Sequence, residues 1–111
     1  MGGIGEARIR VPDRVAKGDL IVVNAIISHP MDTGFFRDAD GKPIPAYFIK
    51  DVVITYGDRE VARFMWTSGI SRDPVVSFNL VADREGPLTM KWTDSKGAVF
   101  EQTAQITFST T

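Results

Sequence analysis

Two stretches near the C-terminal end of the chain alternate between apolar or small residues and polar ones, residue by residue. They cover residues 88–93 and 100–108. Successive side chains on a β-strand point to opposite faces, so this period of two predicts strands with one buried face. No segment shows the three-to-four-residue stripe of an amphipathic helix, and we therefore expect an all-β fold. The inward-facing set is predicted to be Leu88, Met90 and Trp92, followed by Phe100, Gln102, Ala104, Ile106 and Phe108.

The rest of the chain supplies further strand candidates separated by turn residues. We expect strands near residues 7–11, 19–27, 47–56, 60–65 and 76–80, with a glycine turn at 57–59 that makes a hairpin of the third and fourth. The segment 19–27 is a nearly continuous apolar run, which predicts a strand buried on both faces. About seven strands at this spacing suit an antiparallel sandwich, although the pattern alone leaves a barrel open.

The composition and charge of the chain exclude several classes of function. The 111 residues include 43% hydrophobic residues, enough for one core, and we expect a single domain over 1–111. Thirteen basic and fourteen acidic residues are scattered without a run of like charge, so no nucleic acid partner is expected. No apolar stretch is long enough for a membrane span, and residues 1–6 do not resemble an export signal. The absence of cysteine excludes disulfides, thiolate catalysis, iron–sulfur clusters and cysteine-ligated metals.

The segment 28–46 interrupts the regular strand spacing. Its nineteen residues include three prolines, two glycines and the adjacent Phe35 and Phe36. Loops of this length are uncommon in compact domains and are often functional, and the prolines should stiffen this one. An exposed, stiff loop that carries Met31, Phe35 and Phe36 is a candidate for contact with another protein.

Single residues in this region allow chemical interpretations, and the competing structural ones are stronger. His29 is the only histidine, and its neighbour Ser28 cannot form a triad with it on an extended segment, so we favour a role in ordering the loop or contacting a partner. His29 and Met31 together are too few ligands for copper. Asp32, Asp38 and Asp40 do not have the spacing of a calcium loop, and Arg37 lies among them.

A second apolar group stands at the end of the predicted strand 60–65. Phe64, Met65 and Trp66 place large side chains on both faces in succession, so a loop or a partner must cover one side. Trp92, by contrast, is expected in the core because it alternates with Met90 and Leu88.

The loop also carries the most specific sequence pattern. Residues 27–34 read ISHPMDTG and residues 37–45 read RDADGKPIP, ahead of a strand; GISRDP at 69–74 and WTDSKG at 92–97 support them. This arrangement resembles the Z subunits of the Sox sulfur-carrier complex over nearly the whole chain, from Arg8 to Phe108.

The resemblance implies an immunoglobulin-like β-sandwich that forms a heterodimer, open to further assembly, with SoxY. In that family a cysteine on the C-terminal arm of SoxY carries the sulfur intermediates, and the Z subunit supplies neither nucleophile nor cofactor. The resemblance further implies transient docking to SoxAX, SoxB and SoxCD-type enzymes, and a periplasmic location reached by export together with SoxY.

Two other functions remain open from the residues alone: a free-standing ligand-binding or adhesion module, which would be a stable monomer, and an enzyme that uses His29. The residues expected to contact a partner are His29, Met31, Phe35, Phe36, Arg37, Phe64, Met65 and Trp66.

Overall fold

Seven strands and no helix make up residues 3–109, the part of the chain that the computed structural model describes. Residues 1–2 and 110–111, which belong to the expected domain 1–111, lie outside this description. Because residues 3–109 contain no helix, none of them forms a membrane-spanning one. The strands are β1 (Ala7–Arg10), β2 (Leu20–Ile27), β3 (Ile49–Tyr56), β4 (Arg59–Met65), β5 (Val75–Val81), β6 (Gly86–Asp94) and β7 (Val99–Ile106).

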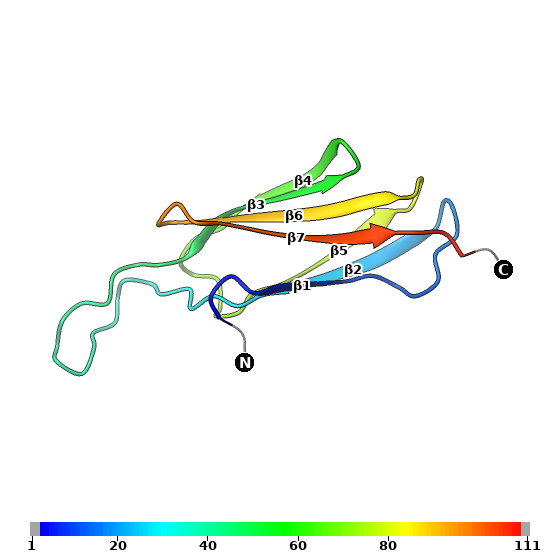
Figure 1. Ribbon diagram of the computed structural model, residues 1–111. Helices are drawn as coiled ribbons and strands as arrows, with labels where there is room; N and C mark the ends of the chain where they lie inside the picture. Colours follow the sequence, from blue (N-terminus) through cyan, green and yellow to red (C-terminus); the bar gives the residue numbers. More distant parts are fainter. Residues whose placement is uncertain (1–2, 110–111) are drawn as a thin grey trace.

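The strands form two layers, as Figure 1 shows. One sheet has the order β1-β2-β5 and the other β4-β3-β6-β7, and every pairing is antiparallel. This arrangement confirms the predicted all-β, immunoglobulin-like sandwich and decides against a closed barrel. On one side of the sandwich β1 lies against β7, whereas on the other side β4 and β5 do not meet. The molecule is therefore closed along one lateral edge and open along the other.

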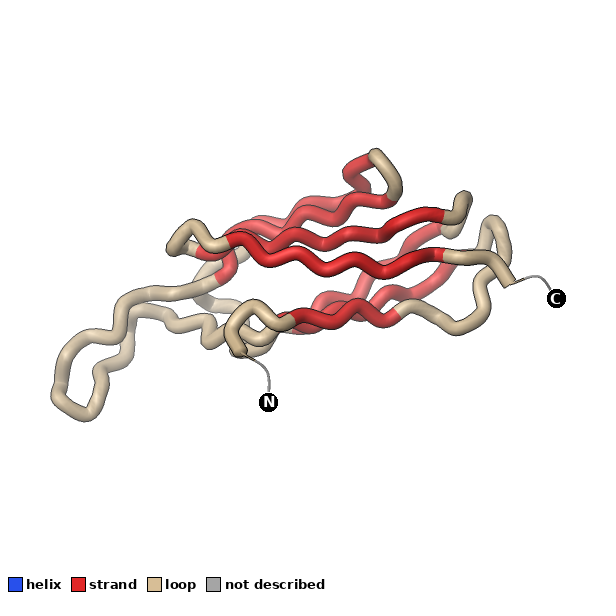
Figure 2. The backbone as a smooth tube through the Cα atoms, in the orientation of Figure 1, coloured by secondary structure: helices blue, strands red, loops and turns tan. Residues whose placement is uncertain are grey.

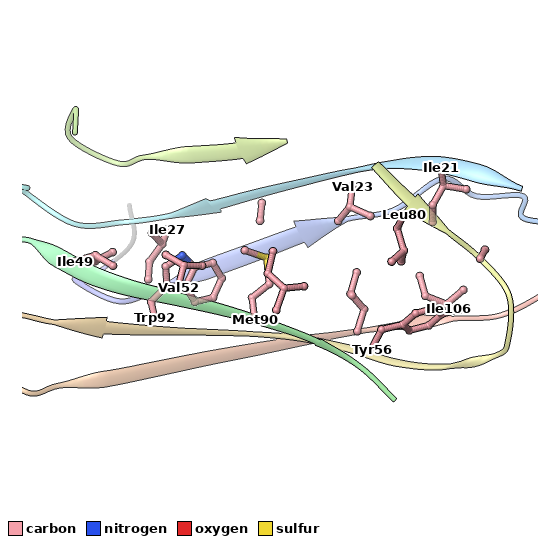
Figure 3. Packing of buried hydrophobic residues seen from close by; sticks show 14 of the residues in the cluster. Ile21, Val23, Ile27, Ile49, Val52, Tyr56, Leu80, Met90, Trp92 and Ile106 are labelled. Carbon is pink, nitrogen blue, oxygen red and sulfur yellow. The ribbon is translucent and has the colours of Figure 1, made fainter. Parts of the chain in front are cut away.

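The core lies between the two sheets (Figure 3), where Ile21, Val23 and Ile27 of β2 face Met90 and Trp92 of β6. Leu88, Met90 and Trp92 are all buried, which confirms the inward face predicted from the alternation. Burying a side chain as large as that of tryptophan contributes several kcal/mol.

The prediction that the segment 19–27 is buried on both faces is wrong. Its burial alternates along β2: Leu20, Val22 and Ile26 are 67%, 53% and 42% exposed. The second sheet covers only one face of the β1-β2-β5 sheet, and no other element of the described chain covers the opposite face. Apolar residues on both faces therefore leave an exposed apolar surface on the outside of the sandwich.

Residues 28–48, here called the arm, connect β2 to β3 and project beyond the ends of the strands (Figures 1 and 2). The arm is a ribbon of two facing legs. Asp32 and Tyr47 exchange backbone hydrogen bonds of 2.7 and 2.9 Å near its base, and the N–H of Ile44 donates to the carbonyl of Phe36 nearer its tip. The arm contributes to the length of the molecule, whose extents are 60 × 26 × 18 Å.

Candidate partner interface

The base of the arm is fastened to the sandwich through His29. The residue is 1% exposed, and it exchanges hydrogen bonds with Asp73. The His29 N–H donates to the Asp73 carboxylate and the Asp73 N–H donates to the His29 carbonyl, both at 2.9 Å. The imidazole Nδ1 accepts a hydrogen bond from the Met31 N–H at 3.1 Å. Since Nδ1 is an acceptor, a neutral ring carries its proton on Nε2.

Nε2 of His29 faces a buried carboxylate at the end of β6. It lies 3.6 Å from Oδ2 of Asp94, whose exposed fraction is 0%. The other carboxylate oxygen of Asp94 accepts hydrogen bonds from the N–H groups of Lys96 and Ala98, both at 2.9 Å. Asp94 thus holds the β6–β7 turn together and presents its remaining oxygen to the histidine.

Tyr47 completes this base from the returning leg of the arm. Its ring packs against that of His29 with centroids 4.4 Å apart, and the ammonium of Lys96 lies over the Tyr47 ring at 3.9 Å from its centroid. Both legs of the arm and the β6–β7 turn therefore meet at one point. A cation over an aromatic ring adds a modest stabilisation to this contact.

Burial lowers the pKa of His29 below its usual value, and the neighbouring Asp94 carboxylate only partly opposes this effect. The pKa of Tyr47 is raised, by burial first and by Asp94 second. The imidazole is consequently neutral at pH 7, with Nδ1 engaged by Met31 and Nε2 enclosed against Asp94. This arrangement orders the arm and presents no free ring nitrogen to solvent.

Met31 also lies inside the molecule. Its side chain is 4% exposed, and its sulfur accepts a hydrogen bond from the Ile49 N–H at 3.3 Å. The expectation that Met31 is on the exposed part of the loop is therefore wrong: the chain turns inward here, with a left-handed φ of 51°, and packs the side chain into the core. Neither His29 nor Met31 offers contact surface in this structure.

The tip of the arm, in contrast, is fully in solvent. Phe35 and Phe36 are 89% and 67% exposed, and Arg37 beside them is also exposed. The Arg37 guanidinium donates to the carbonyl of Gly41 at 2.9 Å, which holds the turn at the tip. Two adjacent exposed phenylalanines are costly to leave in water and are common at protein interfaces.

The third candidate group lies at the end of β4. Met65 is 82% exposed on the outer face of its sheet, whereas Phe64 and Trp66 are half-buried on the inner face and pack against the core. The prediction that these residues occupy both faces is confirmed by this alternation. Phe64 and Trp66 line a groove of about 300 Å³ with Ile70, Pro74 and Val76, at the open side of the sandwich between β4 and β5.

Two features of this region were not identified from the sequence. The burial of Asp94 does not follow from the sequence, because the pattern D-S-K-G at 94–97 is typical of a turn and gives no sign that the carboxylate is buried. The exposed apolar face of the β1-β2-β5 sheet does not follow from the sequence either, because a nearly continuous apolar run such as 19–27 predicts a buried strand. No group of three or more His, Cys, Asp or Glu side chains that could hold a metal ion occurs within residues 3–109.

Comparison with known proteins gives one family and one fold. The family described as "Sulphur oxidation protein SoxZ" matches residues 9–105. No curated protein matches the chain. Among solved structures, the sulfur carrier protein SoxY from Chlorobium limicola f thiosulfatophilum matches with a TM-score of 0.64 and 16% identity, covering 93% of this chain and 78% of SoxY.

Superoxide reductases (neelaredoxins) have the same fold. The enzyme from Ignicoccus hospitalis matches with a TM-score of 0.69 and 16% identity, covering 93% of this chain and 80% of the enzyme. A mutant of the Archaeoglobus fulgidus enzyme in the reduced form matches with a TM-score of 0.66 and 18% identity, covering 95% and 91%. At these identities the likeness concerns the fold alone.

Proposed function

Since the chain belongs to the SoxZ family of sulphur oxidation proteins, we propose that it is the binding subunit of a SoxYZ carrier pair: it holds SoxY through contact surface and performs no chemistry itself. The proposal depends mainly on one observation, which is where the candidate functional side chains lie relative to the core and the solvent. The only histidine is buried and structural, whereas large apolar side chains stand in solvent at the arm tip and the end of β4.

A contact role follows from where the apolar groups lie. Phe35 and Phe36 at the arm tip, Met65 on β4 and the groove beside Trp66 are all outside the core. Burying one phenylalanine removes enough apolar area from water to contribute about 1.5–3 kcal/mol. A few such anchors, surrounded by weaker contacts, supply most of the affinity of a typical protein pair.

A catalytic role has little support from the same residues. The chain contains no thiol, and both ring nitrogens of His29 face other parts of the protein. A sulfur intermediate would therefore have to be bound covalently by the partner. We propose that SoxY carries it and that this chain helps present SoxY to SoxAX, SoxB and SoxCD-type enzymes in the periplasm.

The proposal is tested by measuring the affinity of the purified chain for its cognate SoxY by calorimetry. We expect a stable complex, and we expect the double variant Phe35→Ala/Phe36→Ala to bind at least tenfold more weakly. Val61→Ala, which shortens an exposed apolar residue in the middle of β4, serves as the control and should bind within about twofold of wild type. A chain that remains monomeric in the presence of SoxY, or that turns over a sulfur compound unaided, would contradict the proposal.

A further inference from the structure

The sandwich has four lateral edge strands, and they differ in how they are protected. Exposed edges attract other strands, and proteins normally guard them with charges, prolines, bulges, short length or a cover. β1 has four residues, two of them arginine, and ends before Pro12. β4 carries Arg59, Glu60 and Arg63 and contains a register irregularity opposite Ile54 and Thr55. β7 carries Glu101 and lies against β1.

β5 has none of these protections. Its seven residues, VVSFNLV, contain no charge and no proline, and its register with β2 is uninterrupted from Val75 to Val81. It ends the order β1-β2-β5, and no described strand pairs with its outer side. The edge is therefore seven residues long, regular and uncharged, a combination that favours strand addition.

The hydrogen-bond pattern identifies which backbone groups point outward. The Ile27 N–H donates to the Pro74 carbonyl and the Ala82 N–H donates to the Asp19 carbonyl, and both pairs share the register of the β2–β5 ladder. In an antiparallel ladder, residues directly opposite alternate between bonded and non-bonded pairs. Val76, Phe78 and Leu80 are therefore bonded to β2, and the N–H groups directed away from the sheet belong to Val75, Ser77, Asn79 and Val81.

Apolar surface flanks this edge on both sides. On the outer face, Val75 and Val81 at the two ends of β5 are 61% and 52% exposed and lie directly opposite Ile26 and Leu20 of β2, with the polar Ser77 and Asn79 between them. On the inner side, the groove lined by Phe64, Trp66 and Ile70 opens between β4 and β5. A strand added to β5 would thus place alternate side chains against the apolar inner groove and against an outer face that is apolar at both ends and polar in its middle, so it must itself be uncharged and apolar on its inner face.

We propose that the outer edge of β5 is where SoxY binds, by adding one of its own edge strands so that a sheet continues from one sandwich into the other. This inference rests on the proposed function. We assign the added strand to SoxY because SoxY has the same sandwich fold and therefore has edge strands of matching geometry.

The dimensions of the edge are consistent with such a pair. Seven residues span roughly 23 Å. The molecule measures 18 Å along its shortest axis, so the side that β5 presents to a partner has an area on the order of 400 Å². A stable interface buries ~800 Å² on each partner. The edge therefore accounts for about half of this area, and the arm is expected to bury much of the rest. The arm and the first residues of β5 lie at the same end of the sandwich, since Asp73 is bonded to His29.

Hydrogen exchange of the backbone amides tests the inference directly. In the chain alone, the N–H groups of Ser77 and Asn79 should exchange fast, and those of Phe78 and Leu80 slowly. In the complex with SoxY, we expect Ser77 and Asn79 to slow by at least tenfold, because their N–H groups become bonded to the partner strand.

Substitution gives an independent measurement. Ser77→Pro removes an outward N–H and leaves the backbone bonds to β2 in place, and proline is tolerated at such edge positions; it should weaken SoxY binding at least tenfold. Ser77→Ala, which loses only the hydrogen bond that the Ser77 hydroxyl donates to Asn24 of β2, should bind within about threefold of wild type. On the β4 edge the Trp66 N–H donates to the Lys50 carbonyl, so by the same alternation the N–H of Arg63 points away from β3. Arg63→Pro therefore removes an outward N–H in the same way and is the matched control, with an expected change below threefold. Should Ser77→Pro fail to fold, Asn79→Lys places a charge on the same edge and keeps the backbone intact; it should also bind at least tenfold more weakly.

Each outcome has a separate meaning. If the complex forms while Ser77 and Asn79 exchange as fast as before and the β5 variants bind normally, the edge inference is overturned and the binding function stands. If wild type does not bind SoxY at all, the proposed function fails, and this inference with it. The chain without SoxY gives the third outcome. If its Ser77 and Asn79 amides already exchange slowly, and if this protection increases with protein concentration as dimers form, then a second copy of the chain occupies the edge and the assignment to SoxY is wrong.

Discussion

Replacing His29 with alanine should loosen the base of the arm. The substitution removes the acceptor of the Met31 N–H, the ring packed against Tyr47 and the Nε2–H that faces Asp94. All of these groups lie at the junction of the arm with the sandwich, so their loss should be felt both in the stability of the whole chain and in the order of the arm.

The size of the effect follows from three contributions. A buried N–H left without an acceptor costs about 1–3 kcal/mol. The aromatic contact with Tyr47 contributes about 0.5–1.5 kcal/mol beyond its area. Removing the Nε2–H that faces the buried Oδ2 of Asp94 leaves that oxygen without its neighbour, which adds about 1–3 kcal/mol. Since these contributions overlap, we expect His29→Ala to lower the free energy of unfolding by about 3–5 kcal/mol.

Urea unfolding at pH 7 measures this change. His29→Asn is a graded comparison, because the Asn side-chain oxygen can replace Nδ1 as acceptor of the Met31 N–H while the contact with Asp94 is lost; its loss should be about half that of alanine. Phe35→Ala, in a side chain that is 89% exposed, should change stability by less than about 0.5 kcal/mol.

Amide exchange locates the effect. In His29→Ala the Met31 amide should exchange much faster than in wild type under native conditions, whereas the core amide of Trp92 should follow only the global stability. A loss below about 1 kcal/mol for His29→Ala, or an unchanged Met31 amide, would refute the anchoring role argued for this histidine.

Three further predictions concern pH, the core and the arm. Because burial lowers the pKa of folded His29 below the unfolded value of 6.5, the unfolded chain binds a proton first; urea midpoints should therefore fall as pH drops from 6.5 toward the folded pKa, and His29→Asn should remove this part of the slope. Trp92→Ala should cost about 3–5 kcal/mol in the same assay, because the indole is fully buried between the sheets. Gly34→Ala should destabilise the arm by about 1 kcal/mol or more, since φ is +89° and the new Cβ would lie 3.2 Å from that of Ala46; faster exchange of the arm amides, with core amides unchanged, would show it.

Much of the fold can be predicted from patterns of a few consecutive residues. Alternation at residues 88–93 and 100–108 predicted β6 and β7 with the correct inward face, and the glycine turn at 57–59 predicted the β3–β4 hairpin. These features are local because the period of a strand and the conformation of a tight turn depend on a few consecutive residues. The same holds for the loop 28–46, because its length and its three prolines are enough to predict a stiff loop between two strands.

What remained undetermined depends on contacts between distant segments. Asp94 is buried where the arm brings His29 beside it, and nothing in the residues close to either one in the sequence indicates that contact. The apolar run of β2 is exposed on one face because its sheet has a cover on one side only, and β5 is an unprotected edge because the strand order ends there. The amino-acid sequence by itself therefore determined which segments become strands and which residues could be buried. The tertiary structure decided which faces and edges stay open to a partner, because strand order and sheet packing arise from pairings between residues far apart in the chain.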